Sequence, residues 1–315
     1  MDGELLEQNA GPAGPVVGLG QASLDFLGVA PRFPALDSKC ELSTLVVQGG
    51  GPAATALVAL SRLGVKTAFI GAVGDDAFGP RIRNELAGEG VDVGRLLVAP
   101  GGVSQTAFVA IDEQTGARTI FWHRGRGLER DLTAVDFAVI SSARLLHLDG
   151  LKLDSSLAAA RVARTAGVPT VLDAGTLRPG CLELAGLVDY LIVSEKFMAD
   201  FNPGPDPAEG LVRLKALGPR HAVVTLGERG SLGYDGEVFN RQPAYRVKVL
   251  DTTGAGDAYH GGYIYGVLAG WGLAAAMRFA AALAALKCRG IGGRTALPDL
   301  ETVTTFLNDP AVSFR

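Results

Sequence analysis

Apolar and polar positions along the chain follow two alternating patterns. Short runs rich in β-branched and other apolar residues are typical of buried strands, and they lie at 16–20, 67–73, 144–150, 169–175, 188–194 and 221–227. Longer segments between them space their apolar residues as helices do, at 55–64, 78–90 and 155–167. This alternation predicts βαβ units, and therefore a mostly parallel sheet with helices on both faces.

One part of the first half departs from this pattern. Residues 103–125 form two segments of alternating polarity around the turn sequence DEQTGAR, which predicts a β-hairpin. Residues 28–50 are also strand-like, but prolines interrupt them. We therefore expect a small β-sheet, formed from about 24–48 and 100–126, that acts as a lid within a single α/β domain spanning 15–315.

Composition narrows the class of protein. Of the 315 residues, 48% are hydrophobic and 20% are charged, which fits a globular protein with a large core. The net charge of −4 gives no field that attracts nucleic acid or an anionic membrane, so we expect neither partner. Three widely spaced cysteines suit neither a disulfide framework nor a zinc site, which favours the reducing cytoplasm. The acidic N-terminus lacks an apolar run, and we expect residues 1–14 to be poorly ordered.

The stretch DTTGAGDAYHGG, residues 251–262, carries the most informative local chemistry. Gly254 and Gly256 let a ligand approach the backbone, and the first-turn N–H groups of the helix expected to follow favour an anion. Asp257 stands beside them, where a carboxylate can take a proton from a hydroxyl that attacks a bound phosphate. A tight turn followed by an acidic first helical turn is the alternative. The P-loop sequence GxxxxGK[ST] is absent, so another scaffold must hold any nucleotide.

Two separated motifs together resemble a known family. Residues 49–79 (GGGPAATALVALSRLGVKTAFIGAVGDDAFG) and residues 251–262 resemble, in order and separation, the paired signatures of the ribokinase-like, PfkB-type carbohydrate kinases. The resemblance extends from about residue 16 to residue 300. It implies a ribokinase-like three-layer α/β sandwich, with a mostly parallel central sheet and a small β-sheet lid over the sugar. It also implies ATP-dependent phosphorylation of a sugar hydroxyl.

The same resemblance implies roles for individual residues. Asp257 resembles the general base, and Gly254, Ala255 and Gly256 resemble the anion hole for the transferred phosphoryl group. Asp25 stands where the family accepts hydrogen bonds from sugar hydroxyls. The other positions implied to bind the sugar are Gly50 and Gly51, Thr55 in place of the usual Asn, and two further acids, Asp37 and Asp149, for which a structural role after a strand is the alternative.

Two segments resemble the parts of the family fold that border ATP, VVTLGERGSLG and LAALKCRGIGG. The nucleotide contacts that they imply are Thr225, Gly227, Gly230, Ala285, Cys288 and Gly292. A plain β-turn in the first segment and the packing of small residues in the second are the alternatives.

The expected ions are Mg²⁺ and K⁺. The sequence SEKF, from Ser194 to Phe197, stands where much of the family has an N-x-x-E motif that organises Mg²⁺. Transfer from ATP still requires a divalent ion, for which Glu195 acting through water, water alone and Asp257 acting indirectly are the candidate ligands. In some relatives the positions of Asp251 and Thr253 contribute to a monovalent-cation site.

Three segments, GGGPAATA, LKCRGIGGR and GAGDAYHGG, resemble the ketohexokinase-like branch of the family most closely. This implies that a ketose or ketose derivative is phosphorylated at a primary hydroxyl. Within this branch the segments resemble the bacterial 6-deoxy-6-sulfofructose kinases in particular, which makes that activity an alternative. The basic residues of the lid segment that can meet a sulfonate or phosphate are Arg118, His123, Arg124 and Arg126. Arg118 also matches a position that touches ATP phosphates, and a solvated basic edge is the other explanation for all four.

Two further functions stay open, a nucleoside kinase and a non-catalytic sugar-binding or nucleotide-binding protein. The retained Asp257 and its glycine loop disfavour the non-catalytic protein, because a sensor has no need of a general base. Lid-to-lid dimers are frequent in the family, so the partners that we expect are a sugar, ATP and a second copy of the chain. His147 and His260 lack metal-ligand spacing and are expected to pack or to face water.

Overall fold

The computed structural model describes residues 14–315. The prediction of poor order for residues 1–14 therefore lies outside the described residues, apart from Gly14. Within the described range, no helix is long and apolar enough to cross a membrane.

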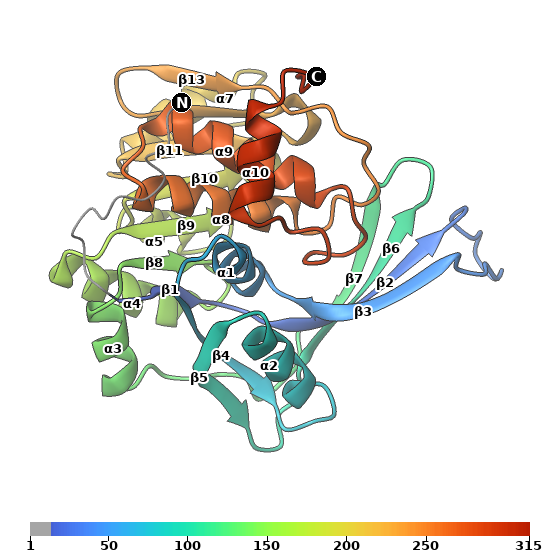
Figure 1. Cartoon of the computed structure of the whole chain (residues 1–315). Helices are drawn as coiled ribbons and strands as arrows, with labels where there is room; N and C mark the ends of the chain where they lie inside the picture. The colour runs from blue at the N-terminus through green and yellow to red at the C-terminus, as the bar shows by residue number, and fades with distance from the viewer. Residues whose placement is uncertain (1–13) are drawn as a thin grey trace.

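A nine-stranded sheet forms the centre of the molecule, in the order β13-β12-β11-β10-β9-β8-β1-β4-β5 (Figure 1). All neighbouring strands from β11 to β5 run parallel, and β12 and β13 add an antiparallel edge. This confirms the predicted mostly parallel sheet. The strands are β1 (Val16–Leu19), β4 (Thr67–Gly74), β5 (Val91–Ala99), β8 (Leu145–Leu148), β9 (Thr170–Ala174), β10 (Tyr190–Ser194), β11 (His221–Thr225), β12 (Ser231–Tyr234) and β13 (Phe239–Gln242).

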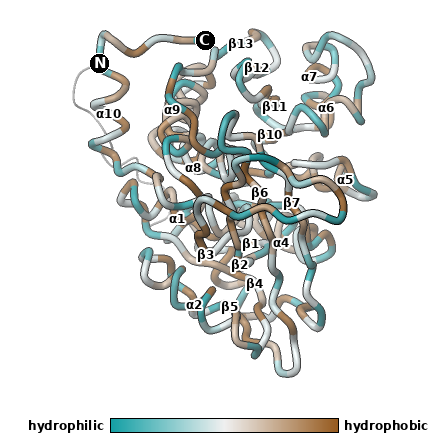
Figure 2. Tube along the Cα trace, turned by 90° about the vertical axis from the view of Figure 1, so that its right-hand side faces the viewer, coloured by the Kyte–Doolittle hydropathy of each residue, from teal (hydrophilic) through white to brown (hydrophobic). Residues whose placement is uncertain are grey.

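Helices cover both faces of this sheet, because neighbouring residues of the central strands are buried on opposite sides. Val16 and Ile192 belong to one core cluster, while Val17 and Val193 belong to the other. Figure 2 shows hydrophobic positions gathered along these central strands. The first cluster packs on α1 (Pro52–Arg62), α2 (Gly79–Gly88), α8 (Ala255–Leu268), α9 (Leu273–Lys287) and α10 (Leu300–Asn308). The second packs on α3 (Ala134–Ser141), α4 (Leu153–Ala166), α5 (Cys181–Ala185), α6 (Glu195–Phe201) and α7 (Pro207–Lys215).

A smaller sheet of four strands projects from this body, in the order β3-β2-β6-β7 (Figure 1). Its strands are β2 (Ser23–Ala30), β3 (Thr44–Gly50), β6 (Gln105–Asp112) and β7 (Arg118–His123). The hairpin expected at 103–125 is present as β6 and β7, which pair antiparallel. All six residues of the edge strand β7 are exposed.

Register across the smaller sheet sorts its side chains between two faces. Asp25, Ala107 and Trp122 lie opposite one another on adjacent strands, so their side chains share a face. Phe108 and Phe121 are also opposite one another. Each is the sequence neighbour of a residue on the face that carries Asp25, so their side chains share the other face. We call these the Asp25 face and the Phe121 face. The Asp25 face carries the carboxylate that is predicted to accept hydrogen bonds from sugar hydroxyls.

Candidate active site

The loop before α8 forms an open cradle of backbone N–H groups. Gly254 caps the helix with φ 76°, and a Cβ there would come within 2.7 Å of the Gly293 Cα, so the position requires glycine. The Ala255 N–H donates to the Thr252 carbonyl. Within residues 14–315, the N–H groups of Gly256 and Asp257 have no hydrogen-bond acceptor, and a Cβ on Gly256 would meet open space. Two free donors at a helix N-terminus can therefore receive an anion.

Asp257 stands at this cradle in the first turn of α8 and keeps partial exposure to solvent. Burial, followed by the negative charge of Asp173, raises the pKa of Asp257 to about 7, although His260 and Arg118 oppose the shift. A carboxylate with a pKa near the working pH is suited to general-base catalysis. The geometry thus places a carboxylate of raised pKa beside two free backbone N–H donors.

His260 lies one turn along α8 from Asp257. Its Nδ1 is 2.7 Å from the Gly256 carbonyl oxygen and 3.6 Å from Asp173 Oδ2, at the end of β9. Its ring centre is 5.8 Å from that of His147, and both histidines are buried. Burial lowers the pKa of each, so both are neutral at pH 7 and pack behind the cradle. Of the two expectations for these histidines, the structure shows packing in the interior.

Asp25, predicted to accept hydrogen bonds from sugar hydroxyls, lies in close contact with the diglycine loop. It accepts a hydrogen bond from Ser23 Oγ at 2.7 Å, and a Cβ on Gly50 would lie only 2.0 Å from its Oδ2. Burial raises the pKa of Asp25, while Ser23 and the charge of Arg294 lower it. Glycine at position 50 therefore leaves the carboxylate its room.

Arg294 is a buried guanidinium that the sequence did not single out. It donates to the Gly50 carbonyl at 3.0 Å and to Thr55 Oγ1 at 3.4 Å, while its Nη1 has no partner within the described residues. Burial lowers the pKa of Arg294, and the charges of Asp25 and Asp257 are among those that favour its charged form. Arg294 is thus within electrostatic range of both predicted acids, and it keeps one buried N–H donor without a partner among the described residues.

The remaining predicted sugar residues divide into two groups. Gly51 caps α1 with φ 98°, and Thr55 is buried on the same helix. Asp149 follows β8, accepts from the Gln21 N–H at 2.7 Å, and has its pKa raised to about 7 by burial. Asp37, by contrast, is exposed in the loop between β2 and β3 and makes no hydrogen bond or ion pair with another described residue.

Arg118 and Arg124, two of the four basic residues predicted to meet the substrate, contact other side chains. Arg118 Nη1 donates to Thr252 Oγ1 at 2.8 Å, which brings β7 against the loop that leads into the cradle. Arg124 stacks on the Trp122 ring at 4.8 Å. His123 and Arg126 are exposed, and Arg126 pairs through its backbone with Val103.

The predicted nucleotide residues lie in two separate segments. Thr225 ends β11, Gly227 begins a short 3₁₀ helix, and Gly230 (φ 87°) would clash through a Cβ with the Gln242 carbonyl at 2.0 Å. A turn requirement therefore accounts for Gly230. In the second segment Ala285 is half-buried near the end of α9, and Cys288 is buried with its thiol pKa raised. Gly292 donates from its N–H to Asp251 Oδ2 at 2.7 Å.

The candidate metal residues are already engaged within the chain. Asp251 Oδ1 accepts from the N–H and Oγ1 of Thr253, and the Glu195 carboxylate pairs with Arg229. Among the residues that the structure describes, no group of three His, Cys, Asp or Glu side chains could hold a metal. The arrangement therefore fits a Mg²⁺ ion held mainly by nucleotide phosphates and water, which need few protein ligands.

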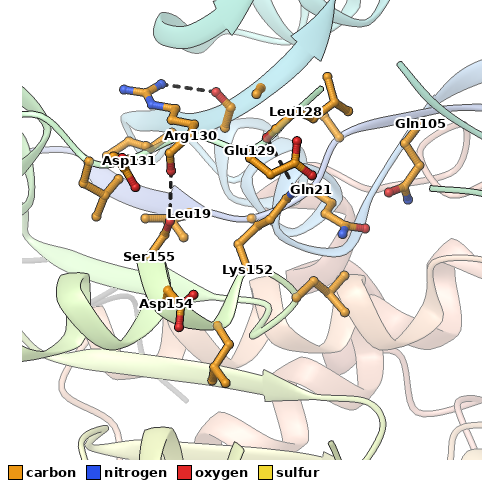
Figure 3. A pocket seen from close by; sticks show the side chains of 18 of the residues that line it. Leu19, Gln21, Gln105, Leu128, Glu129, Arg130, Asp131, Lys152, Asp154 and Ser155 are labelled. Carbon is orange, nitrogen blue, oxygen red and sulfur yellow. Dashed lines mark hydrogen bonds between the residues drawn. The ribbon is translucent and has the colours of Figure 1, made fainter. Parts of the chain in front are cut away.

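A pocket of about 350 Å³ lies towards the carboxyl ends of β1 and β4 (Figure 3). Asp25 and Asp257 do not line it, but Gln21, whose N–H binds Asp149, does. The charged side chains around it have both signs: Arg124, Glu129, Arg130, Asp131, Lys152 and Asp154. Because Arg130 is paired with Asp136, the pocket offers no excess of free cations.

The family model of the pfkB family carbohydrate kinases matches residues 15–300. The chain belongs to this family. The cradle and Asp257 lie close to Asp173 at the end of β9, on the edge of the sheet where α/β folds place their ligands. A 5-dehydro-2-deoxygluconokinase from Clostridium perfringens is 28% identical, over 93% of this chain and 92% of its own length. Fructokinase-1 of Oryza sativa subsp. japonica is 30% identical, over 80% and 82%.

Among solved structures, Arabidopsis thaliana ribokinase complexed with ribose and ATP superimposes with a TM-score of 0.83. It is 26% identical, and the match covers 94% of this chain and 99% of that one. Together with the family model, this confirms the ribokinase-like fold predicted from the two motifs. The chain is accordingly a carbohydrate kinase. The relatives differ in the sugar that their names specify, so the similarity leaves the acceptor undetermined.

Sequence reasoning missed Asp173 and Arg294. Each belongs to a segment discussed above. Asp173 lies in the predicted strand PTVLDAG, and Arg294 ends the segment LKCRGIGGR. A carboxylate that ends a buried strand of a parallel sheet is itself a signal for the ligand edge. Arg294 gave no such signal, because its partners Gly50 and Thr55 are more than 200 positions away in the sequence.

Proposed function

We propose that this enzyme transfers the γ-phosphoryl group of ATP to a primary hydroxyl of a ketose or ketose derivative. One observation carries the proposal: the unpartnered N–H groups of Gly256 and Asp257 adjoin a partly exposed carboxylate whose pKa is about 7. Asp25 lies close enough for its charge to raise the pKa of Asp257, which supports a sugar site next to the phosphoryl site.

In the proposed step, Asp257 takes the proton of the acceptor hydroxyl as its oxygen attacks the γ-phosphorus. The new O–P bond forms while the bond between the γ-phosphorus and its bridging oxygen breaks, and ADP leaves with that oxygen. The N–H groups of Gly256 and Asp257 stabilise the charge on the transferred group. A bound Mg²⁺ supplies positive charge against the phosphates, with Glu195 as a candidate ligand through water.

The acceptor is held from the opposite side of the cradle. Asp25 and Asp149 are carboxylates that can accept hydrogen bonds from sugar hydroxyls, and Arg294 retains a free donor. Thr55 is shorter than the Asn usual in the family and already meets Arg294, so recognition there differs from that of an amide. We propose that the smaller sheet closes over this site as a lid of the domain 15–315, because it carries Asp25 and Arg118.

For ATP, we propose that Arg118 meets the phosphates, since it contacts the loop leading into the cradle. The adenine of ATP would lie between the 225–230 turn and the end of α9. The residues that would contact the nucleotide there are Thr225, Gly227, Gly230, Ala285, Cys288 and Gly292. The free cysteines of the described chain fit a reducing cytoplasm, where ATP is abundant.

A panel of acceptors tests this assignment. Coupled ADP release should be fastest with a neutral ketose such as D-fructose, because the charged lining of the neighbouring pocket is balanced. Faster turnover of 6-deoxy-6-sulfofructose would assign Arg124 and Lys152 to an anionic substituent and favour the sulfofructose kinase. Adenosine is a necessary arm of the panel, because exposed Trp122 on the Asp25 face offers a stacking surface for a nucleobase. AMP-PNP binding with no turnover of any acceptor would favour a non-catalytic protein.

We further propose a homodimer that forms through the Phe121 face of the smaller sheet. Leu45, Phe108 and Phe121 are exposed on this face, with 58%, 39% and 61% of their surfaces accessible. A cluster of large apolar side chains on an edge sheet is typical of a protein interface.

Light scattering during size-exclusion chromatography should give twice the chain mass for the wild type. Phe121→Asp should give the mass of one chain, because dimer formation would bury its unpaired charge in the interface. Ile120→Asp is the matched control on the opposite face of β7, and it should stay dimeric. A monomeric wild type, or loss of the dimer in the control alone, would contradict this interface.

A further inference from the structure

Lys287 is a fully buried cation that the proposed phosphoryl transfer does not use. It ends α9, has no exposed surface, and its Nζ donates to the Asp251 carbonyl oxygen at 2.9 Å. Removing an ammonium group from water is costly unless nearby acceptors and charges compensate it. Its position directly under the active-site loop therefore calls for an explanation.

The carbonyl that Lys287 holds begins the loop that ends in the cradle. On the preceding side, the Leu250 N–H donates to the Cys288 carbonyl at 2.8 Å, so the loop is tied to the end of α9. The Asp251 carboxylate then bonds Thr253 with one oxygen and the Gly292 N–H with the other. The peptide between positions 251 and 252 thus has its carbonyl oriented by the ammonium, three residues before the helix cap.

Negative charges around Lys287 offset part of the penalty of burying its ammonium group. Burial lowers the pKa of Lys287, and Arg118 lowers it further, whereas Asp251, Asp257 and the Cys288 thiol raise it. Asp251 and Asp257 stand at the two ends of the cradle loop. The ammonium is thus in electrostatic contact with both ends.

We propose that the Lys287 ammonium is a tethered cation, which orients the cradle loop by holding the Asp251 carbonyl and takes the place of a free monovalent cation there. Lys287 is then a positioning residue, since it acts on the transferred phosphoryl group only through the loop. The inference rests on the proposed function, because it assumes that the cradle binds phosphate. It competes with the prediction of a K⁺ site at Asp251 and Thr253.

The test compares cations at constant ionic strength. Isothermal titration with Mg·AMP-PNP, and coupled ADP release with D-fructose, are measured in KCl, NH₄Cl and tetramethylammonium chloride. The wild type should behave alike in all three. In tetramethylammonium, Lys287→Ala should have an affinity for AMP-PNP and a rate of ADP release that are each at least about tenfold lower than those of the wild type, as expected when a supporting contact is lost. K⁺ or NH₄⁺ should restore much of this loss, because the deletion leaves room for a small cation next to the Asp251 carbonyl.

Leu286→Ala is the matched control, since it removes a buried side chain from the neighbouring position without removing a charge. It should lower the melting temperature without creating any dependence on K⁺ or NH₄⁺. Activation of the wild type by K⁺, wild-type behaviour of Lys287→Met, or a Lys287→Ala defect that no cation relieves would each overturn the proposal. If the wild type binds AMP-PNP but phosphorylates no sugar, only the proposed function falls. If it does not bind AMP-PNP, both fall.

Discussion

Replacement of Asp257 by Asn should lower kcat by about 10²- to 10⁴-fold, the usual contribution of a positioned general base. Asn keeps the size of the side chain and leaves the backbone N–H of the cradle in place, but it cannot take the acceptor proton. Affinity for Mg·AMP-PNP, measured by titration, should therefore stay close to the wild-type value. The pair of measurements separates loss of the base from loss of the fold or of the anion hole.

The dependence of kcat on pH gives a second test of Asp257 as the base, because the direction of the change can be predicted. The carboxylate acts as a base only when it is deprotonated, and burial with the charge of Asp173 raises its pKa to about 7. Wild-type kcat should consequently rise as the pH increases through about 7 and fall away below it. In Asp257→Asn the residual rate should lack this rise. An unchanged kcat, or an unchanged rising limb in the variant, would exclude Asp257 as the base.

Replacement of Asp25 by Asn should raise KM for the sugar by about 10- to 100-fold, because hydrogen bonds to a charged acceptor contribute about 1.5–3 kcal/mol each. The carboxylate accepts from Ser23 Oγ and lies within the field of Arg294, and the amide would reproduce neither its charge nor its acceptor capacity. KM for ATP should not change, since Asp25 belongs to the sugar side. Initial rates with the best acceptor of the panel, varied against a fixed ATP concentration, give both constants.

Asp37→Asn is the matched control for this substitution. Both acids were predicted to bind the sugar, but Asp37 is exposed and makes no hydrogen bond within the described chain. Its replacement should leave both KM values at the wild-type level. A large effect of Asp37→Asn together with a small effect of Asp25→Asn would reverse the assignment, and would show that the loop between β2 and β3 folds onto the sugar.

Much of the fold could be predicted because its signals are local. Buried parallel strands such as 188–194 appear as continuous apolar runs, and the hairpin at 103–125 has strict alternation around a glycine turn. The order of the nine strands is not local, since β1 lies between β4 and β8. Periodicity does not contain that information, so the sequence predicts a mostly parallel sheet but not the order of its strands.

The candidate site shows the same division. Gly254, Gly256 and Asp257 lie within four consecutive positions, so their spacing alone indicates a helix N-terminus with an acid beside it. Arg294 and Lys287 could not be found in this way. Their roles depend on a guanidinium meeting Gly50 and an ammonium meeting the Asp251 carbonyl, contacts that join segments distant in the chain. In the sequence alone, a Lys or Arg that the fold buries cannot be distinguished from one that is exposed to solvent.

The most direct test of the cradle is a crystal structure with Mg·AMP-PNP and the preferred ketose bound. We predict that γ-phosphate oxygens accept hydrogen bonds from the N–H groups of Gly256 and Asp257. The Asp257 carboxylate should lie about 2.6–3.2 Å from the acceptor hydroxyl, the reach of a general base. A triphosphate bound elsewhere, with the cradle empty and Asp257 turned away from the sugar, would contradict the account.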